Sequence, residues 1–301
     1  MEIILQNLID FDLENAFKLI NSQFISTVIG ALFGAFAGAF AAHKIAINGR
    51  RREFLEVQLR STNVAITSVF LTCNSVLGLK GQHVQNLYLQ FLSDKERCQT
   101  ALKNRDLSDK QIHFEMDFKI FHMPFVPFDD VSRLMQRELS LKGRPLALVS
   151  TLQSSLDLLR QSIEHRNDLI NNYKSTFEEL SHRQMLSVYF GFPLPNGSVN
   201  QEYSDTVQAI YQYADDVIFF SSFLCSDLVE HGERIREQYK KEFRRWLEKT
   251  TIPNFDTGRA KELQPNQADY EDWLKMFQEH PKEPSWLDRI RLLKGFLKIT
   301  K

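Results

Sequence analysis

Residues 24–42 contain no charged side chain, and this run limits what the chain can fold into more than any other feature. Its only hydroxyl side chains are Ser26 and Thr27. At about 1.5 Å per residue, a helix of this length crosses most of a hydrocarbon core, and Ile45 and Ile47 can extend it. A buried helix of a soluble core is rarely apolar on every side. We therefore expect one transmembrane helix over residues 23–47.

Charges on either side of this run predict its orientation. Residues 1–22 carry four acidic side chains and one lysine, whereas four basic side chains follow the run: Lys44, Arg50, Arg51 and Arg52. By the positive-inside rule, the N-terminus lies outside the cell (inner) membrane and the C-terminal body is cytoplasmic. Residues 1–22 suit a short amphipathic helix at the outer interface, or an extension of the span. The alternative of a cleaved signal peptide lacks a basic leading region, although small residues at 37–42 would suit cleavage.

Three glycines recur at intervals of four within the predicted span: Gly30, Gly34 and Gly38. On a helix this spacing places them on one face, with alanines beside them, so another helix can approach closely. Such spacing also arises by chance in membrane helices. We interpret this face as a helix-association face and expect a homo-oligomer.

Residues 48–250 are expected to form a cytoplasmic helical bundle. Apolar residues alternate at three and four positions over 55–77, 149–180 and 207–246, the spacing that packs long helices in a coiled-coil-like manner. Gly78 and Gly81 are expected to end the first helix and to begin a hairpin with a second over 84–102. The predicted fold class is thus all-α: a transmembrane helix followed by an elongated antiparallel bundle.

Two features interrupt this helical pattern. Arg166 falls within the apolar stripe of 149–180, where we expect it to reach solvent or to pair with a carboxylate of a facing helix. Apolar and polar residues alternate with period two near 112–121, which favours one short β-strand or hairpin. His113, Glu115 and Asp117 share one face of such a strand, but His122 points the other way, so we expect no metal site.

Residues 251–301 are expected to form a proline-containing arm that ends in a basic amphipathic helix. In its last part apolar residues oppose basic ones, as in helices that lie on an anionic membrane surface. Docking of this helix on the bundle is an equal alternative. The residues assigned to a membrane-surface helix are Trp286, Arg289, Arg291, Lys294 and Lys298.

The sequence carries few signs of chemistry. A formal charge of −1 gives no reason to expect a nucleic-acid partner, and the three cysteines are too far apart for a disulfide framework or a zinc site. Phosphate-loop, dinucleotide, zinc-protease and nucleophile-elbow motifs are absent. Arg160 and His165 have the spacing seen in helical ribonucleases of the HEPN type, a match expected roughly once or twice by chance.

These observations predict a non-enzymatic protein without cofactors or catalytic residues. We expect a membrane-anchored, self-associating helical scaffold or signalling protein that binds an unidentified cytoplasmic protein partner. One alternative is a membrane-perturbing effector, such as a bacterial anti-phage or toxin-like protein, acting through the glycine-rich span. The second alternative is the helical ribonuclease suggested by Arg160 and His165.

Overall fold

The computed structural model describes residues 23–103 and 115–277, and all secondary-structure elements in these ranges are helices. This confirms the all-α fold class. Within these ranges the chain forms two compact units: unit 1 comprises 23–57 and Glu237–Leu247, and unit 2 comprises 58–236 and 248–277. The predicted N-terminal amphipathic segment (1–22) and the basic C-terminal helix lie outside the described residues.

Helix α2 (Gln23–Leu79) is a single helix of 57 residues. It passes through one π-helical turn, η1 (Lys80–Val84), and continues as α3 (Gln85–Lys103). The predicted hairpin at Gly78 and Gly81 is therefore wrong. Glycine ends a helix when it takes the left-handed conformation, and neither glycine has a positive φ.

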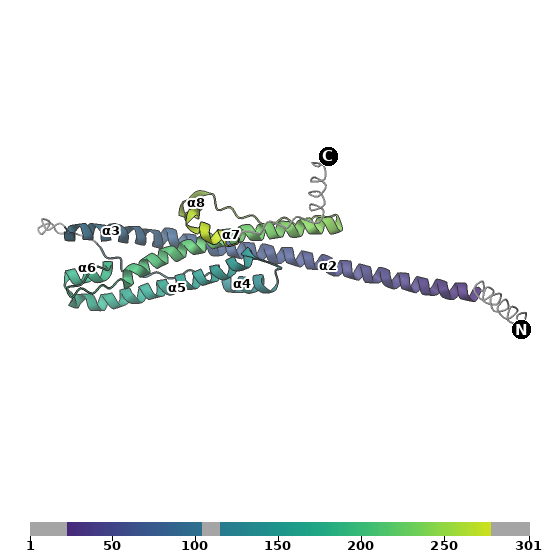
Figure 1. Cartoon of the computed structure of the whole chain (residues 1–301), viewed down its shortest axis with the longest axis horizontal. Helices are drawn as coiled ribbons and strands as arrows, with labels where there is room; N and C mark the ends of the chain where they lie inside the picture. Colours follow the sequence, from purple (N-terminus) through teal and green to yellow (C-terminus); the bar gives the residue numbers. More distant parts are fainter. Residues whose placement is uncertain (1–22, 104–114, 278–301) are drawn as a thin grey trace, which may run out of the picture. The chain divides into compact units, whose positions relative to one another are not determined.

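Within unit 2, helix α7 (Glu202–Phe243) runs antiparallel to α2 (Figure 1). Cys73 Sγ lies 3.9 Å from the carbonyl oxygen of Ile218, and Cys225 Sγ lies 3.8 Å from that of Ile66. Position 73 of α2 therefore meets position 218 of α7, and position 66 meets position 225, as expected of antiparallel helices. Small side chains at these crossings allow the two helices to approach closely.

Helix α5 (Arg144–Thr176) contains the strongest apolar stripe, and the structure confirms that this stripe is buried. Its core members are each at most 1% exposed: Leu148, Val149, Leu152, Leu156, Leu159, Ile163 and Ile170. Contacts from Arg144 to Asp227 and from His165 to Glu202 show that α5 is also antiparallel to α7. Consequently α5 runs parallel to α2, with the shorter α4 (Phe128–Arg137) and α6 (His182–Phe190) at its two ends (Figure 1).

An extended segment brings the chain back before α4, and it replaces the predicted strand. Residues 115–121 are in no strand of the described chain, so the β-strand prediction is wrong for them; 112–114 lie outside the described residues. Arg166 donates from Nη1 to the Lys119 carbonyl oxygen (2.8 Å) and from Nη2 to that of Asp117 (3.0 Å). Since helix side chains satisfy these carbonyl groups, the segment needs no partner strand.

Arg166 itself is 0% exposed, so it does not reach solvent. Its guanidinium carbon lies 5.0 Å from the ring centroid of Phe121 and 5.8 Å from that of Tyr203. The nearest carboxylate oxygen, on Asp117, is 3.9 Å from Nη2 and belongs to the extended segment rather than to a facing helix. Aromatic faces and carbonyl groups therefore stabilise the buried charge.

The described part of the predicted arm packs on unit 2. It contains α8 (Gly258–Leu263), η4 (Gln267–Tyr270) and α9 (Glu271–Lys275). Tyr270 stacks on Phe219 with ring centroids 3.8 Å apart, and its hydroxyl donates to Asp216 at 2.8 Å. The side chain of Lys80, in the π-turn, donates to the Leu263 carbonyl oxygen at 2.8 Å. The arm is thus fastened to both α7 and η1.

Candidate membrane interface and helix-association face

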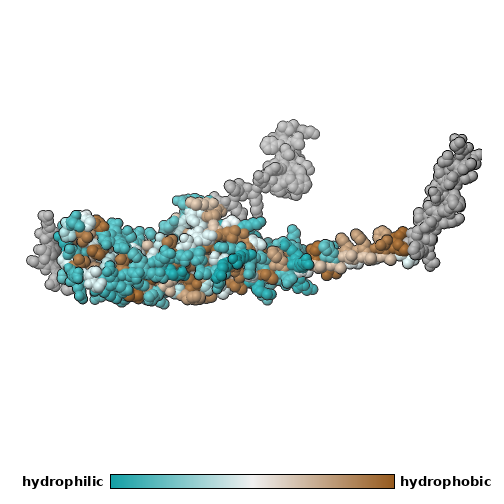
Figure 2. All heavy atoms as spheres, turned by 90° about the horizontal axis from the view of Figure 1, so that it is seen from below, coloured by the Kyte–Doolittle hydropathy of each residue, from teal (hydrophilic) through white to brown (hydrophobic). Residues whose placement is uncertain are grey.

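Residues 26–42 of α2 are apolar, and no other part of the described chain covers them. The apolar window that qualifies it as a candidate membrane span has no buried residue. Its large side chains are strongly exposed: Leu32 66%, Phe33 71%, Phe36 73% and Phe40 61%. Figure 2 shows this part of α2 as a brown and tan surface. The core helices of unit 2, by contrast, bury their apolar faces.

Gly30, Gly34 and Gly38 lie on this exposed part of α2. A Cβ atom built on any of them meets nothing within 4 Å in the described chain. At about 100° per residue, Phe33, Phe36 and Phe40 fall on a different side of the helix. The helix therefore has one face with almost no side chains and another that is rich in phenylalanine.

The basic flank of the predicted span lies in unit 1, where α7 meets α2. Arg51 Nε donates to Glu242 Oε2 at 3.2 Å, and Arg52 Nε donates to Glu56 Oε1 at 2.9 Å. The hydroxyl of Tyr239 also donates to Glu56, at 3.0 Å. The hydrogen bonds from Arg51 hold the pKa of Glu242 below its ordinary value. Arg51 thus joins α2 to α7, and Arg52 pairs with Glu56 within α2. Lys44 and Arg50 are exposed.

The structure adds five residues that sequence analysis did not assign to this flank. The end of α7 and the residues after it carry four basic side chains and a tryptophan, all exposed: Lys240, Lys241, Arg244, Arg245 and Trp246. Lys240 Nζ lies 4.1 Å from the Trp246 ring centroid. The basic run was visible in the sequence, but its position beside Arg51 depends on a contact between residues 191 apart.

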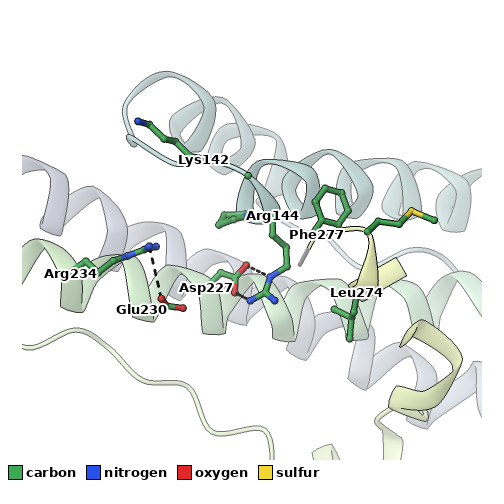
Figure 3. A pocket seen from close by; sticks show the side chains of 10 residues that line it. Lys142, Arg144, Asp227, Glu230, Arg234, Leu274 and Phe277 are labelled. Carbon is green, nitrogen blue, oxygen red and sulfur yellow. Dashed lines mark hydrogen bonds and ion pairs between the residues drawn. The ribbon is translucent and has the colours of Figure 1, made fainter. Parts of the chain in front are cut away.

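An open cleft of about 610 Å³ lies in unit 2 where the start of α5 meets α7 (Figure 3). Arg144 Nε donates to Asp227 Oδ2 at 3.0 Å, and a second nitrogen of Arg144 donates to Oδ1. The carboxylate of Asp227 is 5% exposed, so this bidentate pair fixes α5 against α7. Since Arg144 is held by Asp227 and Arg234 lies near Glu230, the positive charge of the cleft is largely compensated.

A second buried ion pair lies beside the π-turn. Lys80 is 3% exposed, donates to Asp215 and lies over the ring of Tyr211, 5.1 Å from its centroid. Burial raises the pKa of Asp215 above its ordinary value, an effect that Lys80 opposes. Lys80 also donates to the Leu263 carbonyl oxygen in the arm, so this ion pair has a structural role.

The remaining candidate groups do not converge. Arg160 and His165 are 42% and 49% exposed and contact different carboxylates, Asp157 at 3.3 Å and Glu202 at 3.2 Å. Burial raises the pKa of Cys73 to about 11 and also raises that of Cys98 and Cys225, so these thiols are poor nucleophiles. Within 23–103 and 115–277, no group of three His, Cys, Asp or Glu side chains is arranged to hold a metal ion; His113 lies outside these ranges.

No protein-family model, curated protein or solved structure matches the chain.

Proposed function

We propose that the chain is a single-pass membrane protein whose residues 23–47 cross the cell (inner) membrane and whose helical body serves as a scaffold or signalling module. The exposure of the apolar window of α2 carries this proposal. Removing a Leu or Phe side chain from water is worth about 1.5–3 kcal/mol, and four such side chains are more than 60% exposed here. A hydrocarbon core would cover the side chains that the described residues leave exposed.

Self-association through Gly30, Gly34 and Gly38 is the second part of the proposal. Interfaces between membrane helices are enriched in small residues because these let backbones approach closely, and all three positions are open. The body would then bind a cytoplasmic protein partner. Because α2 contains both the span and core positions of unit 2, its packing would couple oligomerisation to the state of the body.

Membrane insertion is tested by alkaline extraction of membranes from cells that express the full chain. We expect the protein in the membrane pellet at its full mass. In the variant Phe33→Arg, Phe36→Arg each charge costs about 2.5–3.5 kcal/mol at the centre of a span, so the protein should move to the soluble fraction. Release of the unmodified protein by alkali would contradict the proposal. So would a mature mass that lacks the first forty or so residues, as expected of a cleaved signal peptide.

Self-association is tested with Gly34→Ile, Gly38→Ile, which fills the open face. We expect the detergent-solubilised variant to have a smaller oligomeric mass in native mass spectrometry, while the control Phe36→Ile, on another side of the same helix, keeps the parental mass. An unchanged mass in the glycine variant would exclude this face as the contact.

The unmodified protein and its variant Gly34→Ile, Gly38→Ile also distinguish the scaffold from the membrane-perturbing effector. An effector that acts through the glycine face should make cells permeable to a membrane-impermeant dye when overexpressed, and Gly34→Ile, Gly38→Ile should abolish this leak. If the protein is a scaffold, neither the unmodified protein nor the glycine variant should make the cells permeable.

A further inference from the structure

The end of α7 contacts α2 at Arg51, within unit 1. Three hydrogen bonds fix this position: Arg51 donates to Glu242 from Nε at 3.2 Å and from Nη2 at 3.3 Å, and the hydroxyl of Tyr239 donates to Glu56 at 3.0 Å. Along α2, Arg51 is only four residues, or about 6 Å, beyond Ile47, where the predicted span ends. The end of α7 is therefore held close to the boundary of the proposed membrane segment.

This end of α7 concentrates positive charge. The described part of unit 1 contains eight basic and four acidic side chains, an excess of four positive charges. Two of the acids, Glu56 and Glu242, are engaged by Arg52 and Arg51. Six basic side chains are exposed and lie in no ion pair within the described residues: Lys44, Arg50, Lys240, Lys241, Arg244 and Arg245.

Backbone geometry directs the last of these residues. Arg244 follows the final residue of α7 and has a φ of 57°, in the left-handed region that ends helices and that few residues other than glycine adopt. The chain turns there, so Arg245 and Trp246 extend the basic surface beyond the helix. Trp246 is 54% exposed, and its ring has the mixed character that favours the boundary between lipid and water.

We propose that the end of α7 and the flank of α2 form one binding surface for anionic lipid headgroups; this inference rests on the membrane anchor proposed above. We call this surface the basic collar: Lys44, Arg50, Lys240, Lys241, Arg244, Arg245 and Trp246. The partial negative charge of a helix C-terminus favours one or two cations in its last turn. It does not account for an exposed tryptophan, or for the second set of cations on α2.

An anionic leaflet is the occupant that this arrangement fits. Basic side chains next to a membrane span are attracted to anionic lipids over roughly one Debye length, about 8–10 Å. By our estimate along α2, the end of α7 lies within that distance of the span. The flank of α2 and the end of α7 would then bind the same headgroups, so lipid binding would stabilise the contact between α7 and α2.

The test uses Trp246 as a reporter in the full-length protein carrying Trp273→Phe and Trp286→Phe. The protein is reconstituted into vesicles of phosphatidylcholine with a fixed minority of phosphatidylglycerol, and either lipid in turn carries bromine atoms that quench tryptophan fluorescence. We expect brominated phosphatidylglycerol to quench Trp246 about fivefold more per molecule than brominated phosphatidylcholine, the preference that one basic side chain supplies near an anionic surface. High salt should remove this difference.

The variant Lys241→Gln, Arg244→Gln, Arg245→Gln removes three of the six cations of the basic collar and should lower the quenching ratio. The variant Lys103→Gln, Lys174→Gln, Arg183→Gln removes the same charge from unit 2 and should leave the ratio unchanged. Lys240 is kept in both because it contacts Trp246. A ratio of one in the parent overturns the inference. So does a ratio in the α7 variant that equals that of the parent, or an equal loss in both variants. Circular dichroism checks that each variant is folded.

Alkaline extraction of the same vesicles separates this inference from the proposed function. If the parent resists extraction but shows no preference for phosphatidylglycerol, the basic collar is excluded and the membrane anchor stands. If alkali releases the parent, the anchor fails and the collar fails with it.

Discussion

At the scale of single residues, Arg166 shows how a charge is accommodated inside this bundle. Its guanidinium lies near the rings of Phe121 and Tyr203 and donates to two carbonyl groups of the extended segment before α4. A buried cation is expensive unless it is hydrogen-bonded. Arg166 therefore stabilises the bundle by fastening that segment to α5.

Replacing Arg166 by Ala should lower the free energy of unfolding by about 3 kcal/mol, because the carbonyl groups of Asp117 and Lys119 lose their donor in a buried setting. The control is Arg160→Ala on the same helix. It removes only an exposed ion pair, worth about 0–1 kcal/mol. Chemical denaturation of the detergent-solubilised full chain measures both. Equal losses would mean that Arg166 does not hold the segment.

The interruption at Arg166 could be read from the sequence, but its partners could not. The apolar stripe of 149–180 predicts which positions face the core. It says nothing about an extended segment that approaches from 47 residues earlier in the chain. A long basic side chain is expected to reach solvent, but tertiary contacts bury that of Arg166.

At the scale of elements, long periodic helices were predictable and their connections were not. The stripe of α5 is buried as expected because many positions repeat the same preference. Gly78 and Gly81 favoured a turn, yet contacts on both sides of η1 keep the backbone helical. Alternation near 112–121 resembled a strand, but its carbonyl groups are bonded by Arg166 and Asn167.

These two glycines give a matched pair of substitutions. A Cβ at position 78 meets nothing within 4 Å, so Gly78→Ala should stabilise the chain by about 1 kcal/mol through helix propensity. At position 81 a Cβ would lie 2.8 Å from Arg259 Nη2 and 2.9 Å from Leu263 Cδ1. Gly81→Ala should therefore be less stable than Gly78→Ala by about 1–2 kcal/mol.

Limited proteolysis provides the second measurement for this pair. Because α8 contacts η1 through Arg259 and Leu263, Gly81→Ala should speed cleavage between residues 250 and 277, and Gly78→Ala should not. Equal cleavage rates in the two variants would show that α8 does not depend on its contact with η1.

At the scale of the whole molecule, the proposed topology predicts which side of the membrane each part occupies. Added protease should degrade the body in inverted inner-membrane vesicles and leave it intact in spheroplasts, because basic flanks stay in the cytoplasm. The variant Lys44→Glu, Arg50→Glu weakens that bias without touching the Arg51 ion pair and should yield some molecules of opposite orientation. Protection of the body in inverted vesicles would reverse the topology.

The π-turn lets this chain hold one extra residue between α2 and α3, which a uniform α-helix could not do without turning α3. A π-helical turn holds one residue more than an α-helical turn, so the apolar pattern of α3 is shifted by one residue relative to that of α2. On a regular helix, one inserted residue would turn α3 by about 100° away from its neighbours, whereas the π-turn at Lys80–Val84 absorbs it. Deleting Gln82 would therefore make the helix regular and leave α3 with nearly the same face toward the bundle.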